Sequence, residues 1–254
     1  PTPLPIALSI AGSDSGAGAG IQADLLTFAS QGVFGTTAVT CLTAQNPEGV
    51  IGVQAASPEM VRGQIEQVLA YFPVGAAKTG MLFEAAIIDT VVAALSACPS
   101  LPLVVDPVMV ASSGARLLQE DAVAVLRTRL IPLATVVTPN LDEAEILLGR
   151  RPREDVIGLR ADASELAKRL GTAVLLKGGH AKGAQLTDIL VDRAGETLLE
   201  CSANRIAGVD THGSGCTLSA ALAAGLAKGL SLTEAFANAH AYLQAGLSKP
   251  LVAG

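Results

Sequence analysis

A glycine-rich segment near the C-terminal end has the residue types of an anion-binding site. Residues 210–217 read DTHGSGCT, and an apolar helical run follows at 218–226. Gly213 and Gly215 carry no Cβ, so backbone amides can converge on a ligand there. The first N–H groups of a helix lack partners within the helix, and the helix dipole adds positive potential at the same end. A packing turn before an ordinary helix explains the same residues, so both interpretations stay open at this point.

A thiol stands at the expected start of that helix. At such a position Cys216 would ionise more readily than a free cysteine. The thiolate would take a proton from a hydroxyl group and so act as a general base. The alternative is a buried cysteine that only fills space.

Two carboxylates follow neighbouring predicted strands. Asp106 ends the apolar segment 101–105, and Glu143 lies beyond the next strand in the segment 140–145 (NLDEAE). Carboxylates presented in this way could hold Mg²⁺ through water, as when the ion arrives on the phosphates of a nucleotide. Asn140 and Glu143 also have the spacing of a helix N-cap and its N3 partner, a pair that needs no metal.

A lysine follows a third strand. Lys177 comes directly after the apolar residues 173–176 and precedes two glycines. An ammonium here would stabilise the charge of a phosphoryl group during transfer. A surface lysine that lays its stem on apolar neighbours is the alternative. His180 and His212 are interpreted as loop residues, because neither has partners at metal-ligand spacing.

These side chains are expected at the carboxyl ends of parallel strands, where open α/β sheets place their ligands. Strands are predicted at 6–11, 33–42, 76–79, 101–105, 134–138 and 173–176, with a hairpin at 187–191 and 197–202. Helices are predicted at 21–30, 58–71, 85–97, 120–130, 141–148, 162–170 and 218–226, and a capping box opens a last helix at 231. The small-residue loop 12–20 matches neither the dinucleotide fingerprint nor a Walker A loop, and 43–49 is predicted as a turn.

Composition limits the classes of function. The 254 residues are half hydrophobic and carry a net charge of −6 without a dense basic run, so nucleic acid is not an expected partner. Apolar runs stay below the about 18 residues of a membrane span, and the N-terminal segment lacks signal-peptide features, which favours the cytoplasm. Four scattered cysteines indicate neither a disulfide framework nor a zinc site. A single domain over 1–254 is expected.

Eight short motifs follow one another along nearly the whole chain. They are 11–15 (AGSDS), 20–24 (GIQAD), 43–46 (TAQN), 78–82 (KTGML), 106–109 (DPVM), 138–141 (TPNL), 177–180 (KGGH) and 210–217 (DTHGSGCT). With these motifs the chain resembles the hydroxymethylpyrimidine/phosphomethylpyrimidine kinases of thiamine biosynthesis, in the ribokinase-like superfamily. The resemblance implies a single-domain α/β fold, a three-layer α/β/α sandwich with a mostly parallel central sheet.

The resemblance also implies an activity and its partners. The substrates would be 4-amino-5-hydroxymethyl-2-methylpyrimidine and then its monophosphate, phosphorylated with ATP and Mg²⁺. A monovalent cation such as K⁺ and a homodimer are further expectations.

By the same resemblance, single residues take roles at the phosphate end. The anion hole for the transferring phosphate would comprise Gly213, Ser214, Gly215 and Cys216. Cys216 would stand where most ribokinase-like enzymes have an aspartate base, and Lys177 would contact the ATP phosphates. The Mg²⁺ would be served by Asp106 and Glu143, and the nucleotide by Asn140 and Thr211.

At the other end, Gln45 would read the pyrimidine edge, because its amide both donates and accepts hydrogen bonds. The remaining pocket residues would be Gly12, Asp24, Met81 and Val108. The chain departs from many relatives at Gly16-Ala17, where they have Ser-Gly. Ser112 replaces a commonly basic residue, which puts phosphate contacts near that loop in doubt, and a lid at 181–187 has no distinctive sequence.

Two other functions stay open. Pyridoxal kinases share the anion hole, although Gln45 and Met81 in their motifs favour the aminopyrimidine. A non-catalytic sensor of pyrimidine or nucleotide would keep the pocket without turnover. The catalytic set of Cys216, Lys177, Asp106 and Glu143 argues against such a sensor.

Overall fold

The computed structural model describes residues 3–46, 48–109, 118, 120–179, 185–206, 208–209 and 211–249. Within these residues the strands form one sheet in the order β3-β2-β1-β4-β5-β6-β7-β8-β9. Their bounds are β1 Ile6–Asp14, β2 Phe34–Asn46, β3 Gly49–Ala55, β4 Ala76–Thr79, β5 Leu103–Val105, β6 Val136–Val137, β7 Ala173–Leu176, β8 Gln185–Val191 and β9 Thr197–Asn204.

The centre of the sheet is parallel and its two edges are antiparallel. Strands β2, β1, β4, β5, β6 and β7 pair in parallel, whereas β3 and the β8–β9 hairpin pair antiparallel. Strands β4 to β7 are short and completely buried, as expected for parallel strands covered on both faces. The predicted α/β fold with a mostly parallel sheet is confirmed.

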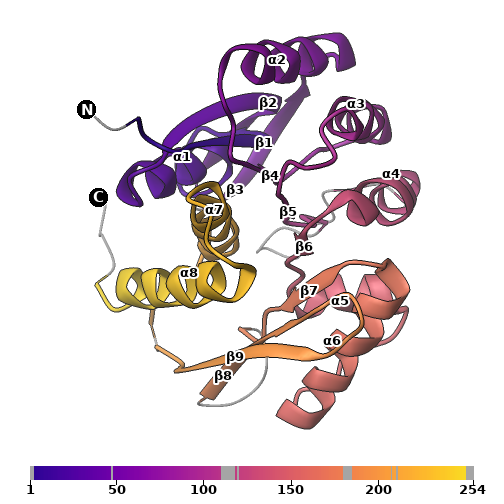
Figure 1. Ribbon diagram of the computed structural model, residues 1–254, viewed down its shortest axis with the longest axis vertical. Coiled ribbons are helices and arrows are strands. Elements are labelled where there is room, and N and C mark those ends of the chain that lie inside the picture. Colours follow the sequence, from indigo (N-terminus) through magenta and orange to yellow (C-terminus); the bar gives the residue numbers. More distant parts are fainter. Residues whose placement is uncertain are drawn as a thin grey trace.

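Helices cover both faces of this sheet. Their bounds are α1 Gly20–Ser30, α2 Pro58–Tyr71, α3 Ala85–Ser96, α4 Glu120–Val125, α5 Leu141–Leu148, α6 Val156–Leu170, α7 Ser214–Ala227 and α8 Leu232–Leu247. Helices α1, α7 and α8 contribute to one hydrophobic core and α2 to α6 to the other. Figure 1 shows these two layers on opposite sides of the sheet. No helix in the described part of the chain is long and apolar enough to cross a membrane.

Helix starts follow the predicted caps. Ser57 accepts the Met60 N–H at the start of α2, and Ser231 forms a reciprocal capping box with Glu234 at α8. The predicted helix 120–130 begins as α4 but continues from Leu126 as a π-helical turn and then a 3₁₀ turn that contains Pro132. Proline cannot donate the backbone hydrogen bond that a longer α-helix would need.

The segment predicted as a turn at 43–49 is mostly strand. Strand β2 runs on to Asn46, and β3 pairs back against it. The Asn46 side-chain oxygen accepts the N–H groups of Glu48 and Gly49, so the reversal itself is very short. Turn-forming residues in the sequence marked the right place but suggested too long a loop.

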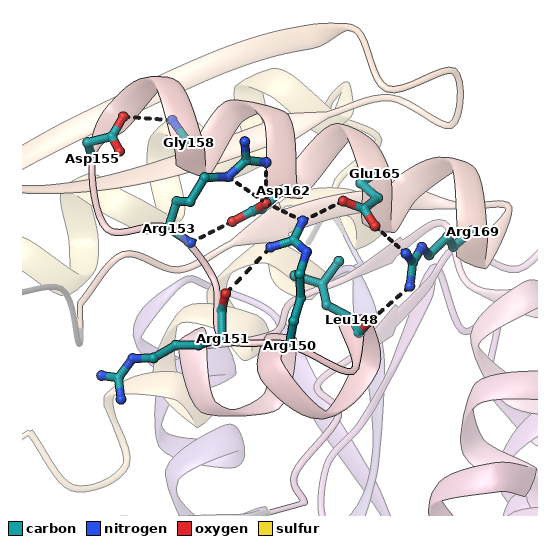
Figure 2. Close-up of polar contacts among 9 residues, drawn as sticks. All are labelled: Leu148, Arg150, Arg151, Arg153, Asp155, Gly158, Asp162, Glu165 and Arg169. Carbon is teal, nitrogen blue, oxygen red and sulfur yellow. Dashed lines mark hydrogen bonds and ion pairs between the residues drawn. The ribbon is translucent and has the colours of Figure 1, made fainter.

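Helix α6 begins earlier than predicted. Asp155 caps it by accepting the Gly158 N–H, and Asp162, expected as its first residue, lies in its middle. Figure 2 shows why the buried Asp162 carboxylate is tolerated there: Arg150 and Arg153 both donate to it. From the sequence alone, an aspartate at position 162 did not indicate a buried helical position, because its arginine partners were not known. The first part of α6 was therefore not predicted.

Candidate active site

A cavity of about 770 Å³ opens at the carboxyl ends of the parallel strands. The predicted site residues that line it are Gly12, Gln45, Met81, Asp106, Val108, Asn140, Glu143, Lys177, Thr211, Gly213, Ser214, Gly215 and Cys216. These residues come from strand ends, helix starts and loops that are separated by most of the chain. The structure therefore brings all of the predicted site residues into one cavity except Asp24.

The start of α7 packs directly against the N-terminal loop. Gly213 caps the helix with φ +76°, and a Cβ there would lie 1.8 Å from the Gly18 carbonyl oxygen. Only glycine fits both the left-handed backbone and this close approach. The N–H groups of Gly215 and Cys216 follow in the first helical turn, where the helix supplies no acceptor. This helix start has backbone geometry that fits an anion hole, and the role of residues 213–216 as an anion hole stays a prediction.

Lys177 stands at this helix start. A Cβ on Gly215 would lie 3.2 Å from the Lys177 Nζ, and the same Nζ lies 3.3 Å from Asp106 Oδ1. The lysine side chain is only 12% exposed, so it is not a surface lysine lying on apolar neighbours. Burial lowers the pKa of Lys177, but the negative charges of Asp106 and Glu143 raise it by more than burial lowers it. The net shift of the pKa is upward, so the ammonium keeps its proton.

Asp106 is held by two hydroxyl groups. Thr138 Oγ1 donates to its Oδ1 over 3.4 Å, and Ser219 Oγ donates to its Oδ2 over 3.1 Å. Ser219 is completely buried in the second turn of α7. Ser219 was not predicted from the sequence, although it is the one hydroxyl residue in the apolar run 218–226 and was a usable signal. The hydroxyl thus connects the carboxylate after β5 to helix α7.

Asn140 and Glu143 form the capping pair that their spacing allowed. The Asn140 side-chain oxygen accepts the Glu143 N–H, and Glu143 Oε2 accepts the Asn140 N–H, each over 2.9 Å. The Glu143 carboxyl group is 3% exposed and borders the cavity. Burial, with a contribution from Asp106, raises the pKa of Glu143 to about 7. The capping interpretation is confirmed, and the role of Glu143 toward a metal stays a prediction.

Cys216 does not ionise easily in the ligand-free structure, which corrects the sequence expectation. Burial raises the pKa of its thiol to about 11; Lys78 lowers it, whereas Asp24 and Asp106 raise it. The helix start is therefore outweighed by desolvation and by two nearby carboxylates. Sequence spacing showed the helix terminus but not the acidic side chains that the fold places around the sulfur.

Asp24 lies beneath the cavity and does not border it. Its side chain is completely inaccessible and forms an ion pair with Lys78, with Nζ to Oδ1 at 2.7 Å. Ser9 donates a further hydrogen bond of 2.6 Å to the same carboxylate. The predicted direct contact between Asp24 and the pyrimidine does not follow from this position, because the carboxylate belongs to a buried polar cluster below the site.

Gln45 faces His212 across the cavity. The Gln45 Nε2 lies 3.4 Å from His212 Nε2, and Thr43 donates to the Gln45 oxygen. His212 Nε2 also lies 3.5 Å from Asp14 Oδ2. His212, interpreted as a loop residue, thus borders the cavity and joins the N-terminal loop to the segment before α7. His180, Ser112 and positions 181–184 of the possible lid lie outside the described residues.

The remaining cavity wall comes from the last strands and α8. Its residues there include Asp188, Ala203, Arg205, His240 and Leu243, none of which was predicted. Asp188 Oδ1 accepts the Gly178 N–H over 2.8 Å and so holds the loop that follows Lys177. An acidic residue in an apolar strand was a signal for Asp188, but nothing in the sequence showed that β8 turns back past the lysine loop.

The family model of phosphomethylpyrimidine kinase matches residues 14–254. The chain belongs to the phosphomethylpyrimidine kinase family. A hydroxymethylpyrimidine/phosphomethylpyrimidine kinase of Rhizobium meliloti (strain 1021) is 49% identical to this family member over 243 residues, which cover 96% of the chain and 90% of the relative. The crystal structure of phosphomethylpyrimidine kinase from Clostridium difficile 630 superposes with a TM-score of 0.82 at 38% identity, covering 95% and 98% of the two chains.

Pyridoxal kinases share the fold of this phosphomethylpyrimidine kinase family member. The pyridoxal kinase of Staphylococcus aureus in complex with AMP-PCP and pyridoxal superposes with a TM-score of 0.87 at 32% identity, covering all of this chain and 91% of that one. The predicted kinase family and its ribokinase-like fold are confirmed. The fold by itself does not show whether the acceptor is a pyrimidine or pyridoxal.

Proposed function

We propose that this cavity transfers the terminal phosphoryl group of ATP to the hydroxymethyl oxygen of 4-amino-5-hydroxymethyl-2-methylpyrimidine, and then phosphorylates the monophosphate. The observation that carries the proposal is the Lys177 ammonium, which lies at the start of α7 and beside Asp106. Fixed positive charge and converging amides are what a transferring phosphoryl group needs, because its catalysis is mainly positioning and charge stabilisation. Family membership supplies the substrate class.

In the first reaction the acceptor oxygen attacks in line with the leaving oxygen of ADP. A bond forms between that oxygen and the terminal phosphorus while the bond from phosphorus to ADP breaks. The hydroxyl proton moves to the Cys216 sulfur, so the thiolate becomes a thiol. The amides of Gly213, Gly215 and Cys216 and the Lys177 ammonium stabilise the charge on the phosphoryl oxygens, whereas the Ser214 N–H donates to the Thr211 carbonyl.

Asp106 and Glu143 fit a Mg²⁺ that enters with the nucleotide. Both carboxyl groups border the cavity beside Lys177. Among the residues that the structure describes, no group of three or more acidic, histidine or cysteine side chains is placed to hold a metal. A Mg²⁺ ion commonly takes one or two carboxylates and completes its shell with water and substrate phosphates, so two are enough. When bound, it would neutralise negative charge on those phosphates.

Ring selection falls to Gln45 in this proposal. Its amide can both donate to and accept from the edge of an aminopyrimidine, with Met81 and Val108 as apolar walls. A pyridoxal kinase is the second candidate, favoured by the structural match to the Staphylococcus aureus enzyme. The expectations of K⁺, a homodimer and a cytoplasmic location rest on resemblance and sequence features, and they remain predictions.

The test is a coupled assay of ADP release with three acceptors: the pyrimidine alcohol, its monophosphate and pyridoxal. We expect kcat/KM to be highest for the two pyrimidines. A higher value for pyridoxal would replace the proposal by the second candidate. Tight pyrimidine binding by calorimetry, without ADP release from any acceptor, would instead indicate a sensor.

A further inference from the structure

A buried ion pair, formed by Asp24 and Lys78, acts electrostatically on the proposed catalytic sulfur. Asp24 of α1 accepts from Lys78 of β4 at both carboxylate oxygens, over 2.7 and 2.9 Å, and from Ser9 of β1 over 2.6 Å. All three side chains are completely inaccessible to solvent. The proposed transfer reaction above assigns no task to any of them.

Strands β1 and β4 place Ser9 and Lys78 on the face of the sheet that α7 covers. Ser9 and Lys78 face each other in the parallel pairing of β1 and β4. They follow Ala7 and Ala76 by two residues, so they project to the same face of the sheet as those alanines. That face is covered by α7, because Ala7 and Ala76 belong to the same core cluster as Leu218 and other α7 residues.

A merely structural task does not explain this ion pair. Two charges lose their hydration when they are buried, and apolar side chains of similar volume commonly hold a helix on a sheet equally well. The Asp24 carboxylate and the Ser9 hydroxyl instead fix the Lys78 ammonium in one position. Both Lys78 and Cys216 border the same cavity. The structure thus supplies a rigidly held cation whose charge acts on the sulfur.

We propose that the Lys78 ammonium, held by Asp24 and Ser9, is the counter-ion of the Cys216 thiolate. Lys78 and Asp24 are then positioning residues, because they act on the reaction through the sulfur and not on the substrate. This inference rests on the proposed function only for its catalytic consequence. The alcohol proton moves to a sulfur whose negative charge Lys78 stabilises against burial and the nearby carboxylates, while Lys78 keeps its own proton.

The electrostatics around the sulfur agree with this assignment. Lys78 from β4 is the strongest attractive charge on Cys216, and the Gly20 N–H from α1 donates a hydrogen bond to it. Asp24 from α1 and Asp106 after β5 oppose the thiolate, while Lys177 after β7 is a second cation in its field. Burial lowers the pKa of Lys78, but Asp24 and then Cys216 raise it, and the net shift is upward.

The test measures the thiol itself and needs no kinase turnover. Full-length protein without nucleotide or Mg²⁺ is treated with iodoacetamide at pH 8, and alkylation of the peptide that contains Cys216 is followed by mass spectrometry. Only the thiolate reacts, so the rate reports its population. Losing a neighbouring opposite charge moves a pKa by about 1–3 units, and the higher nucleophilicity of the more basic sulfur offsets about half of that effect on the rate. We therefore expect Lys78→Met to slow alkylation by about 3- to 30-fold.

Two further variants protect the test against misfolding. The double variant Lys78→Met/Asp24→Asn removes both charges and leaves no orphaned carboxylate. It should also alkylate more slowly than the wild type, because Lys78 acts on the sulfur more strongly than Asp24 does. Asp162→Asn is the matched control, since Asp162 is an equally buried, ion-paired carboxylate of α6 that does not border the cavity (Figure 2). Its Cys216 should react at the wild-type rate.

Wild-type alkylation rates in both folded Lys78 variants would overturn the counter-ion assignment. Equal slowing in Asp162→Asn would overturn it too, because the effect would then be general loosening. The proposed function is tested separately. It fails if the wild-type protein releases no ADP with the acceptors, whatever the alkylation rates are.

Discussion

Asn140 and Glu143 satisfy each other's backbone N–H groups at the start of α5, and the Glu143 carboxyl group also borders the cavity beside Lys177. One side chain thus completes a helix cap and faces the phosphate end of the site. The capping and metal interpretations of the sequence are compatible, because a carboxylate has about four acceptor positions and the backbone N–H groups of Asn140 and Met109 use only part of them. Substitution can separate the two tasks.

Replacing Glu143 by Gln should weaken the use of Mg²⁺ while keeping the helix cap. Glutamine also serves at the N3 position of a capping box, but it carries no charge for a cation. We expect the Mg²⁺ concentration for half-maximal ADP release to rise about tenfold. Glu145→Gln, on the exposed side of the same helix, is the matched control and should not change it. Equal Mg²⁺ dependence in all three proteins would remove Glu143 from the metal site.

The same Glu143→Gln variant should change how stability depends on pH. The folded-state pKa of Glu143 is about 7, above its ordinary value of 4.5, so the unfolded chain releases this proton first as pH rises. The native protein therefore loses stability from Glu143 between about pH 4.5 and 7. Relative to the wild type, the variant should gain unfolding free energy across this window. Urea unfolding at pH 5 and at pH 7 measures it, and a constant difference would contradict the assigned cause.

Cys216→Ala should separate the two phosphorylations. The alcohol needs a base, and its kcat should fall about 10²-fold or more. A phosphate monoester loses its second proton near pH 6, so at pH 8 its oxygen is already ionised and needs no base. The second reaction should therefore lose much less. ADP release is measured with each acceptor at saturation, and equal losses would indicate that Cys216 shapes the anion hole without accepting a proton.

Gly178→Ala should disrupt the loop that follows Lys177. A Cβ there would lie 2.1 Å from the Thr187 carbonyl oxygen, whereas at Gly179 it would meet nothing within 4 Å. Overpacking against backbone costs about 1–3 kcal/mol, which corresponds to a fall in Tm of about 2–12 °C for a chain of this size. Gly179→Ala should melt like the wild type. If the two variants melt alike, the loop has room that the structure does not show.

Local patterns were sufficient to predict most of the fold and most of the residues that line the cavity. The strands β4, β5 and β7 and the caps Ser57 and Ser231 were predictable because periodicity, capping and turn chemistry act over a few residues. The length of β2 and the start of α6 were not. In both places a tertiary partner, the β3 strand or the arginines around Asp162, outweighs the local signal.

The charge states of the site residues also could not be predicted from the sequence. Asp24 was expected against the ring and instead pairs with Lys78, and the Cys216 thiol was expected to ionise easily but is hard to ionise. Both depend on which charged side chains meet across strands and helices that are distant in the chain. A pKa is set by these neighbours and by burial, and neither can be read from spacing.

The contact of Gly18 with Gly213 joins segments almost two hundred residues apart. During synthesis, a chain that ends before residue 213 can already hold Asp106, Lys177 and the Asp24–Lys78 pair, but it has no α7 to bring an anion hole to them. The site is completed only when one of the last helices returns to the first loop. Premature termination anywhere in the first four fifths of the chain therefore yields fragments that lack the helix start proposed to hold the transferring phosphate.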